Sequence, residues 1–197
     1  MQTEKGVITV DPKQEQYSDF YTEETAVLHE LGHRVTSVLN SNLYDLVTAK
    51  SAGTSLGFLD NFFGRQYAGF KSLFKGEIAT ATVIDEGIAE TFALYVFPHV
   101  CEISKESKNT NANRALSYFW FSRRQVENSL ITFIESRYAI GCNFFSKVLS
   151  LTGKEGFIDY IKNLSGENIP LRADFYKSAS YFERQFTGGL IKPVFLD

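Results

Sequence analysis

The sequence predicts a mainly α-helical protein with a small β-strand contribution near its start. Three observations predict this fold class. Apolar residues recur every three or four positions across residues 18–39 and again across 81–97, and helical patterning returns from about residue 115 to the end. This spacing places apolar side chains on one face of a helix. Only the stretch "GVITV", residues 6–10, has the β-branched composition of a short strand.

The composition is that of an ordinary globular protein. The chain has 197 residues, of which 44% are hydrophobic and 22% are charged, so it can bury a core, and we expect one domain over residues 1–197. Its net charge is −3 and its pI is near 5.7, which leaves no broad basic field. Nucleic acid and an anionic membrane surface are therefore not expected as partners, and we expect the protein to act in a pocket.

The sequence shows no targeting or membrane signal. No apolar run approaches the roughly 20 residues that cross a bilayer, and the amino terminus "MQTEKGVITV" has neither the basic region nor the apolar core of a signal peptide. We therefore expect a cytoplasmic protein, or a secreted one if an export signal has been removed. Cys101 and Cys142 are isolated, which favours two buried free thiols over a disulfide or a cysteine zinc knuckle.

The first long helix is predicted from about Ser18 to Leu39. Its apolar residues follow intervals of three and four without an intervening proline: Phe20, Val27, Leu28, Leu31, Val35, Val38 and Leu39. His29 and His33 therefore lie in the middle of this helix.

Residues 40–80 form an insert of different character, in which glycines alternate with aromatic residues. The insert is too apolar for a disordered linker, and glycine permits irregular backbone. We expect a folded excursion with short helical pieces that could wall or cover a cleft. Its aromatic residues between 58 and 74 are either core or apolar contacts for a substrate.

The helical pattern resumes in "ATVIDEGIAETFALYVF", residues 81–97, and should stop at Pro98, which cannot continue a helix. The polar stretch "ESKNTNANR", residues 106–114, predicts a loop. The remaining chain predicts further helices with breaks at Gly153 and at "SGENIP", over residues 115–135, 138–151, 154–164 and 173–186.

The motif "HELGH", residues 29–33, carries the chemistry. Residues four apart share one face of a helix, so His29 and His33 can direct imidazole nitrogens to a single zinc ion. A catalytic zinc takes one further protein ligand and leaves a position to water. Glu30 would then lie beside the zinc-bound water and take its proton as the water attacks a carbonyl. The alternative is a chance match formed by two core histidines.

Gly32, inside this motif, gives a second indication. A glycine within a helix costs up to roughly 1 kcal/mol relative to alanine, so its presence calls for a packing reason. We expect another element to approach the helix closely behind the metal.

A second motif, "DEGIAE" at residues 85–90, places three carboxylates in an otherwise apolar segment. Buried carboxylates are costly unless they are paired or bound to metal. Glu86 and Glu90 are four residues apart and can together face the histidine helix. A solvent-facing acidic stripe is the alternative, and Asp85 as a ligand would point about 100° away from Glu86 around the helix.

Together, "HELGH" and "DEGIAE" resemble the gluzincin metallopeptidases, the class that includes thermolysin and the zinc aminopeptidases. The resemblance implies a zincin-like catalytic domain with one Zn²⁺ ion. It implies that Glu86, at the glutamate of the "NEGxA" segment, is the third zinc ligand. It also implies that Glu90 hydrogen-bonds a ligating histidine and fixes its orientation.

The segment "YAIGCNFFSKVLSLTGKEGFIDYI", from Tyr138, also resembles a Tyr-x-x-Gly helix and the following helix in this superfamily. The resemblance suggests Tyr138 as the donor that stabilises the oxyanion, with a structural tyrosine as the alternative. Two features depart from the family pattern. The insert between His33 and Glu86 is longer than the commonest spacing, and the short amino-terminal portion leaves little room for a substrate-binding sheet.

Other zinc-site patterns fit less well. Metzincins continue as HExxHxxGxxH, whereas Thr36 and Asn40 stand where that glycine and last histidine would fall, and the sole methionine is Met1. The class is therefore excluded. His99 follows Pro98 at a predicted helix end, which is typical of a surface or capping histidine.

These observations predict a zinc metallopeptidase that cleaves a peptide or protein substrate. The main alternative is a zincin-like domain that binds a peptide or protein without cutting it and uses the metal for stability or regulation. Glu30 argues against that alternative, because a structural zinc needs no carboxylate beside an open position. A third alternative is a metal-free protein that binds ligands in an apolar pocket.

Overall fold

The computed structural model describes residues 2–4, 7–9, 21–43, 76–123 and 136–194. Helices make up most of these residues, so the prediction of a mainly α protein is confirmed. Most of the predicted 40–80 insert lies outside the described residues, as do residues 18–20 of the first predicted helix and residues 124–135 of the third.

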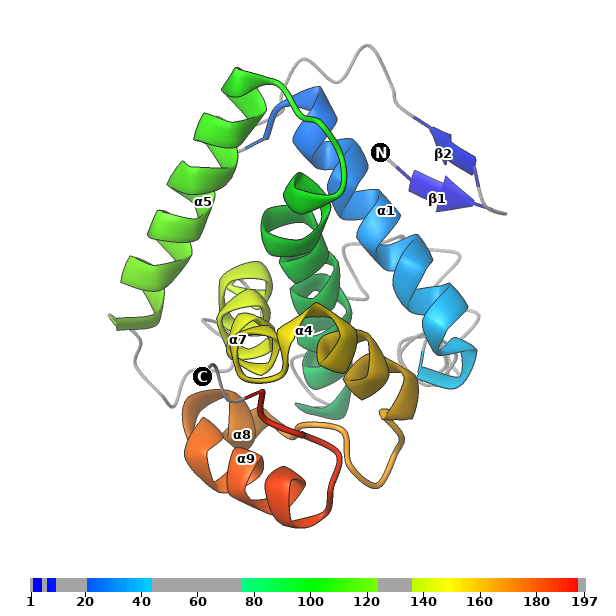
Figure 1. The fold of residues 1–197 in the computed structure, drawn as a ribbon, viewed down its shortest axis with the longest axis vertical. Helices are drawn as coiled ribbons and strands as arrows, with labels where there is room; N and C mark the ends of the chain where they lie inside the picture. The colour runs from blue at the N-terminus through cyan, green and yellow to red at the C-terminus, as the bar shows by residue number, and fades with distance from the viewer. Residues whose placement is uncertain (1, 5–6, 10–20, 44–75, 124–135, 195–197) are drawn as a thin grey trace, which may run out of the picture.

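The amino terminus forms a β-hairpin where the sequence indicated one short strand. Strand β1, Gln2–Glu4, pairs antiparallel with β2, Val7–Thr9, and Thr3 lies opposite Ile8. Both strands contact the first helix, beside which Figure 1 shows them.

Helix α1 spans Glu23–Leu39 and carries both histidines. Thr22 is its N-cap and exchanges hydrogen bonds with Thr25 in a capping box, which satisfies backbone N–H groups that a helix start leaves open. This cap explains why the helix begins at residue 23 instead of the predicted residue 18. At the other end, the Asn40 side chain donates to the carbonyl oxygens of Ile161 and Leu164, each at 2.8 Å.

Helix α4, Gly76–Thr91, carries the second motif. It continues as a π-helical turn, η1, Phe92–Val96, and a 3-10 turn, η2, Phe97–His99. The predicted stop at Pro98 is therefore only partly right. The α-helical geometry ends at Thr91, and Pro98 sits in the first turn of η2, where its missing N–H is tolerated.

Helix α5 spans Lys105–Arg123, so the loop predicted over residues 106–114 is wrong. Ser104 precedes the helix, and its hydroxyl accepts a hydrogen bond from the backbone N–H of Ser107 at 3.1 Å. Most of the polar residues that suggested a loop form the exposed face of the helix. Three of them, Ser107, Asn111 and Arg114, are instead buried against the rest of the protein.

The carboxy-terminal part consists of three helices. Helix α7, Arg137–Asn163, is broken at Gly153, whose φ of 67° interrupts the helix at the position that the sequence predicts. Helix α8, Arg172–Tyr176, and helix α9, Ser178–Thr187, replace the single helix predicted over 173–186 because Lys177 leaves helical geometry between them.

Helix α4 is the centre of the described fold. Figure 1 shows it between α1 and α5, with α7 beside it and α8 and α9 below. It contacts both α1 and α7. Its apolar residues join one core with those of η1, α7, α8 and α9, including Val83, Ile84, Ile88, Phe92, Phe144, Phe145, Phe157, Phe175 and Tyr181.

Glycines let these helices approach closely. A Cβ atom added to Gly32 would lie 2.6 Å from the carbonyl oxygen of Ala89, so α1 meets α4 backbone to backbone at this point. This confirms the close approach that Gly32 predicted. On another face of α4, Gly87 lies against Gly141 of α7, and a Cβ on Gly141 would come within 2.6 Å of Gly87 Cα.

The structure also bears on the expectations for the two cysteines and for a membrane span. Cys101 and Cys142 are both free thiols, but only Cys142 is buried, so the expectation of burial is wrong for Cys101. Within the described residues, the helices lack the combination of length and apolar character that a membrane span requires.

Gly141→Ala should destabilise the fold, because the new methyl group would collide with the backbone of α4. Although alanine is the better helix former, overpacking of this kind costs typically about 1–3 kcal/mol. Chemical denaturation of the metal-free protein measures the free energy of unfolding. Gly166→Ala is the control, since a Cβ there meets nothing within 4 Å. Equal stability of the two variants would contradict the packing described here.

Candidate metal centre

The crossing of α1 and α4 brings the two motifs together. The helices touch where Gly32 meets Ala89. On α1, His29 and His33 lie three residues before and one residue after the contact, and on α4 Glu86 and Glu90 have the same offsets from Ala89. Residues four apart share a face, so both pairs face each other across the crossing.

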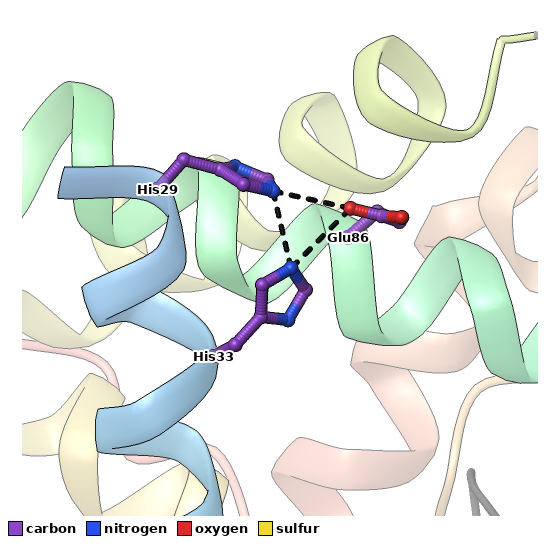
Figure 2. Close-up of side chains that lie close together, drawn as sticks. All are labelled: His29, His33 and Glu86. Atoms are coloured by element: carbon purple, nitrogen blue, oxygen red, sulfur yellow. Dashed lines mark hydrogen bonds and ion pairs between the residues drawn. The ribbon is translucent and has the colours of Figure 1, made fainter. Parts of the chain in front are cut away.

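Three side-chain atoms from these helices converge. His29 Nε2 lies 3.1 Å from Glu86 Oε2, His33 Nε2 lies 3.4 Å from the same oxygen, and the two Nε2 atoms are 3.1 Å apart. Figure 2 shows the imidazoles on α1 and the Glu86 carboxylate on α4 pointing at one another. The group is shielded without being sealed, since the His33 and Glu86 side chains are 17% and 16% exposed.

Each imidazole is held from behind by a carboxylate. His29 Nδ1 donates to Glu90 Oε2 at 2.8 Å, and His33 Nδ1 donates to Asp85 Oδ1 at 3.0 Å. An ionised carboxylate only accepts hydrogen bonds, so both Nδ1 atoms carry hydrogen. In neutral imidazoles, both Nε2 lone pairs then face Glu86 Oε2. Three acceptors at this separation repel one another unless a proton or a metal cation lies among them.

Arg137 and Tyr138, at the start of α7, border the same group. Arg137 Nε lies 3.4 Å from Glu86 Oε1, the oxygen that faces away from the histidines. The Tyr138 ring lies 5.5 Å from the His29 ring between centroids, and its hydroxyl accepts from Arg137 at 3.4 Å. Burial and the nearby Glu86 charge raise the pKa of Tyr138, so its phenol stays protonated at neutral pH and can donate a hydrogen bond.

Glu90 is the centre of a buried polar network. Its side chain is fully buried, as is that of Arg114 on α5, with which it forms an ion pair. Tyr118, one turn further along α5, donates to Glu90 Oε1 at 2.8 Å. Tyr21 donates to Oε2 at 3.5 Å, and its ring stacks under the Arg114 guanidinium at 3.9 Å.

In the metal-free protein these contacts hold positive charge on the histidines. Burial alone would lower the pKa of His33, but hydrogen bonds to Asp85 and Glu86 outweigh it and raise the pKa to about 11. The pKa of His29 is raised as well, because hydrogen bonds to Glu86 and Glu90 outweigh its burial. Burial opposes ionisation of Glu86, yet hydrogen bonds from the two histidines hold its pKa far below the usual range.

The donor set suits zinc chemically and geometrically. Two imidazole nitrogens and one carboxylate oxygen are a common ligand set of catalytic zinc sites. Ligand atoms at about 2.0–2.1 Å from a tetrahedral zinc ion lie about 3.3–3.4 Å apart. The three ligand atoms here lie 3.1, 3.1 and 3.4 Å apart. The side chains therefore fit the ion with only small adjustments.

Most of the residues selected from the sequence gather at this point. His29, His33 and Glu86 form the convergent group. Glu90 accepts a hydrogen bond from His29, and the Tyr138 ring lies beside the His29 ring. Glu30 is half-buried on α1. His99 is exposed at the end of η2 and is not a member of the convergent group, as expected of a surface histidine.

Sequence reasoning missed several partners. Asp85 was considered only as a ligand, whereas it holds His33 Nδ1. Its position directly before Glu86 in the sequence could have indicated that it also lies near the histidines. Arg137 precedes the tyrosine chosen from the resemblance and was overlooked. Arg114 was hidden because residues 106–114, which lie in α5, were interpreted as a loop. Tyr118 falls within the helix predicted from residue 115, but nothing in the sequence marked it as a partner of Glu90.

Comparison of this chain with protein-family models, with curated proteins and with solved structures finds no match.

The metal-free protein should lose stability as the pH rises above about 6.5. A histidine with a raised folded-state pKa stabilises the fold fully below its unfolded pKa of 6.5, and for His33 this contribution disappears as the pH rises towards about 11. The loss is at most about 1.4 kcal/mol per pH unit for each histidine. Zinc bound by the same nitrogens would compete with these protons, so any increase in Tm on adding zinc should grow over the same range.

Calorimetry between pH 6.5 and 9, with EDTA and with zinc, measures both trends. His33→Gln should flatten the metal-free slope, and His99→Gln, which changes an exposed histidine, is the matched control. A metal-free Tm that rises with pH over this range would contradict the arrangement of charges.

Zinc affinities should separate the roles of the two glutamates. Glu86→Ala removes one of the three candidate ligand atoms and one negative charge, so the variant should lose most zinc on dialysis. Glu90→Ala leaves the ligand set intact and should lower affinity by the roughly 10–100-fold typical of outer-shell partners. Glu183→Ala, an exposed glutamate on α9, is the control. A larger loss for Glu90→Ala than for Glu86→Ala would contradict this assignment.

Proposed function

We propose that this chain is a zinc-dependent metallopeptidase with a zincin-like domain of the gluzincin type, acting on a peptide or protein substrate. The observation that carries the proposal is the convergence of His29 Nε2, His33 Nε2 and Glu86 Oε2, whose ligand atoms all lie within 4.8 Å of one another. Carboxylates on both Nδ1 atoms support it, because ligating histidines usually donate their other N–H in this way.

The motif residues divide the chemistry among them. Zinc at this centre would lower the pKa of a bound water towards 7 and polarise the carbonyl of the bond to be cut. Glu30 takes the proton of the attacking water and passes it to the leaving amine. Asp85 and Glu90 keep Nδ1 of each histidine protonated and Nε2 free. Tyr138, protonated at neutral pH, donates a hydrogen bond to the oxyanion that develops on the substrate.

The partly exposed side chains suggest how a substrate would reach the centre. Glu90 is fully enclosed by α5, whereas His33, Asp85 and Arg137 keep part of their side chains accessible to solvent, at 17%, 26% and 35%. A peptide would therefore approach on the side of Asp85 and Arg137. A cytoplasmic location stays a prediction from the sequence.

Glu30→Gln should keep zinc and lose most hydrolysis. The amide preserves the shape of the side chain but cannot take a proton, and removal of a general base typically costs on the order of 10²–10⁴ in rate. Zinc content and turnover of a library of fluorogenic peptides are measured on the same sample. Glu23→Gln, an exposed glutamate in the first turn of the same helix, is the matched control.

The outcomes distinguish the candidate functions. Unchanged turnover in Glu30→Gln would remove Glu30 from the mechanism. One equivalent of zinc in a wild-type protein that cuts no peptide of the library would favour a non-catalytic domain that binds a peptide or protein partner. A wild-type protein that binds no zinc would contradict both the zinc peptidase and the non-catalytic zinc-binding domain.

A further inference from the structure

Arg114 is the largest fully buried side chain of the described residues, and it carries a charge. It extends from α5 into the core and forms an ion pair with Glu90 Oε1. Its second terminal nitrogen donates to Asn111 Oδ1 at 3.3 Å, and Tyr21 stacks on its guanidinium plane. A buried charge needs such partners, because removal from water is costly.

A purely structural role does not account well for this arginine. A buried ion pair is often no more stabilising than apolar residues of similar volume. Arg114 Nε, moreover, has no hydrogen-bond partner in the part of the chain that the structure describes, and an unsatisfied buried donor is itself unfavourable. Stability alone therefore does not explain the buried ion pair between Arg114 and Glu90.

The contacts of Glu90 supply one. Its two oxygens have different tasks: Oε1 accepts from Arg114 and from Tyr118, whereas Oε2 accepts from His29 Nδ1 at 2.8 Å. With Oε1 held on α5, the carboxylate cannot rotate away from His29. The orientation of the imidazole, and hence the direction of its Nε2 lone pair, is then fixed through Glu90.

We infer that Arg114 is a positioning residue of the metal centre, which acts through Glu90 to aim His29 Nε2 at the metal. This inference rests on the proposed metal centre. It extends the centre to a third helix, because Arg114 and Tyr118 are four residues apart on one face of α5. The packing of α5 against α1 and α7, which places Arg114 and Tyr118 at Glu90, thereby becomes part of the ligand geometry.

A double-mutant cycle on zinc affinity tests the inference. Full-length wild type, Arg114→Gln, Glu90→Gln and the double variant are compared by competition with a chromophoric zinc chelator, below the Tm of every variant. Each single change should lower affinity roughly 10–100-fold. The double variant should bind zinc about as weakly as Glu90→Gln alone, because Arg114 acts only through Glu90.

Tyr160→Phe is the stability control. Tyr160 is buried and its hydroxyl lies 2.8 Å from that of Tyr181, and none of its described contacts reaches the metal centre. The variant should lower Tm without changing zinc affinity, which separates loss of stability from loss of positioning. Wild-type affinity in folded Arg114→Gln, or losses that multiply in the double variant, would overturn the inference.

Arg114→Gln leaves Glu90 buried without a counter-charge and can fail to fold for that reason. Arg114→Lys then carries the test, since it keeps the charge but lacks the planar fork that reaches two partners. It should bind zinc about tenfold more weakly than wild type, and unchanged affinity would overturn the inference. The double-mutant cycle measures zinc affinity and does not depend on hydrolysis. A protein that binds zinc but cuts no peptide would therefore contradict the proposed peptidase activity and not the role of Arg114. A wild type without zinc affinity would contradict both.

Discussion

The backbone contact between Gly32 of α1 and Ala89 of α4 is the constraint on which the candidate centre depends. A side chain at residue 32 would force the helices apart, because an added Cβ would lie 2.6 Å from the Ala89 carbonyl oxygen. At this separation, side chains that flank the contact on each helix reach one another directly. Gly87 and Gly141 set an equally close contact between α4 and α7, which brings Arg137 and Tyr138 to the same group.

Charge balance explains why so many ionised groups can share this space. Each convergent side chain has one partner of its own behind it: Glu90 for His29, Asp85 for His33 and Arg137 for Glu86. In the metal-free protein, protons on the two histidines compensate the three carboxylates together with Arg114 and Arg137. A divalent cation can replace those protons without changing the contacts behind the ligands, because the Nδ1 hydrogens stay in place.

The sequence could predict the parts of this centre that follow from spacing within one helix. Intervals of four residues predicted that the two histidines share one helix face and the two glutamates another. Gly32 predicted a close contact with another element. The hydrogen bond between His33 and Asp85 could not be predicted, because it depends on the crossing of two helices. The second half of helix α5 falls in the helix predicted from residue 115, whereas residues 106–114 were predicted as a loop because they are polar. A polar helical segment that is stabilised by tertiary contacts shows little apolar periodicity.

Glu86 and Glu90 show how tertiary context separates residues that look equivalent in the sequence. Both face α1 from the same side of α4. Glu90 lies where α5 closes over the centre, so its second oxygen is occupied by Arg114 and Tyr118 and it meets His29 at Nδ1. Glu86 lies one turn earlier on the same face of α4, where its side chain is 16% exposed, and meets both histidines at Nε2. The enclosed carboxylate can orient a neighbouring imidazole but is out of reach of any molecule in solution, whereas the Glu86 side chain keeps 16% of its surface exposed.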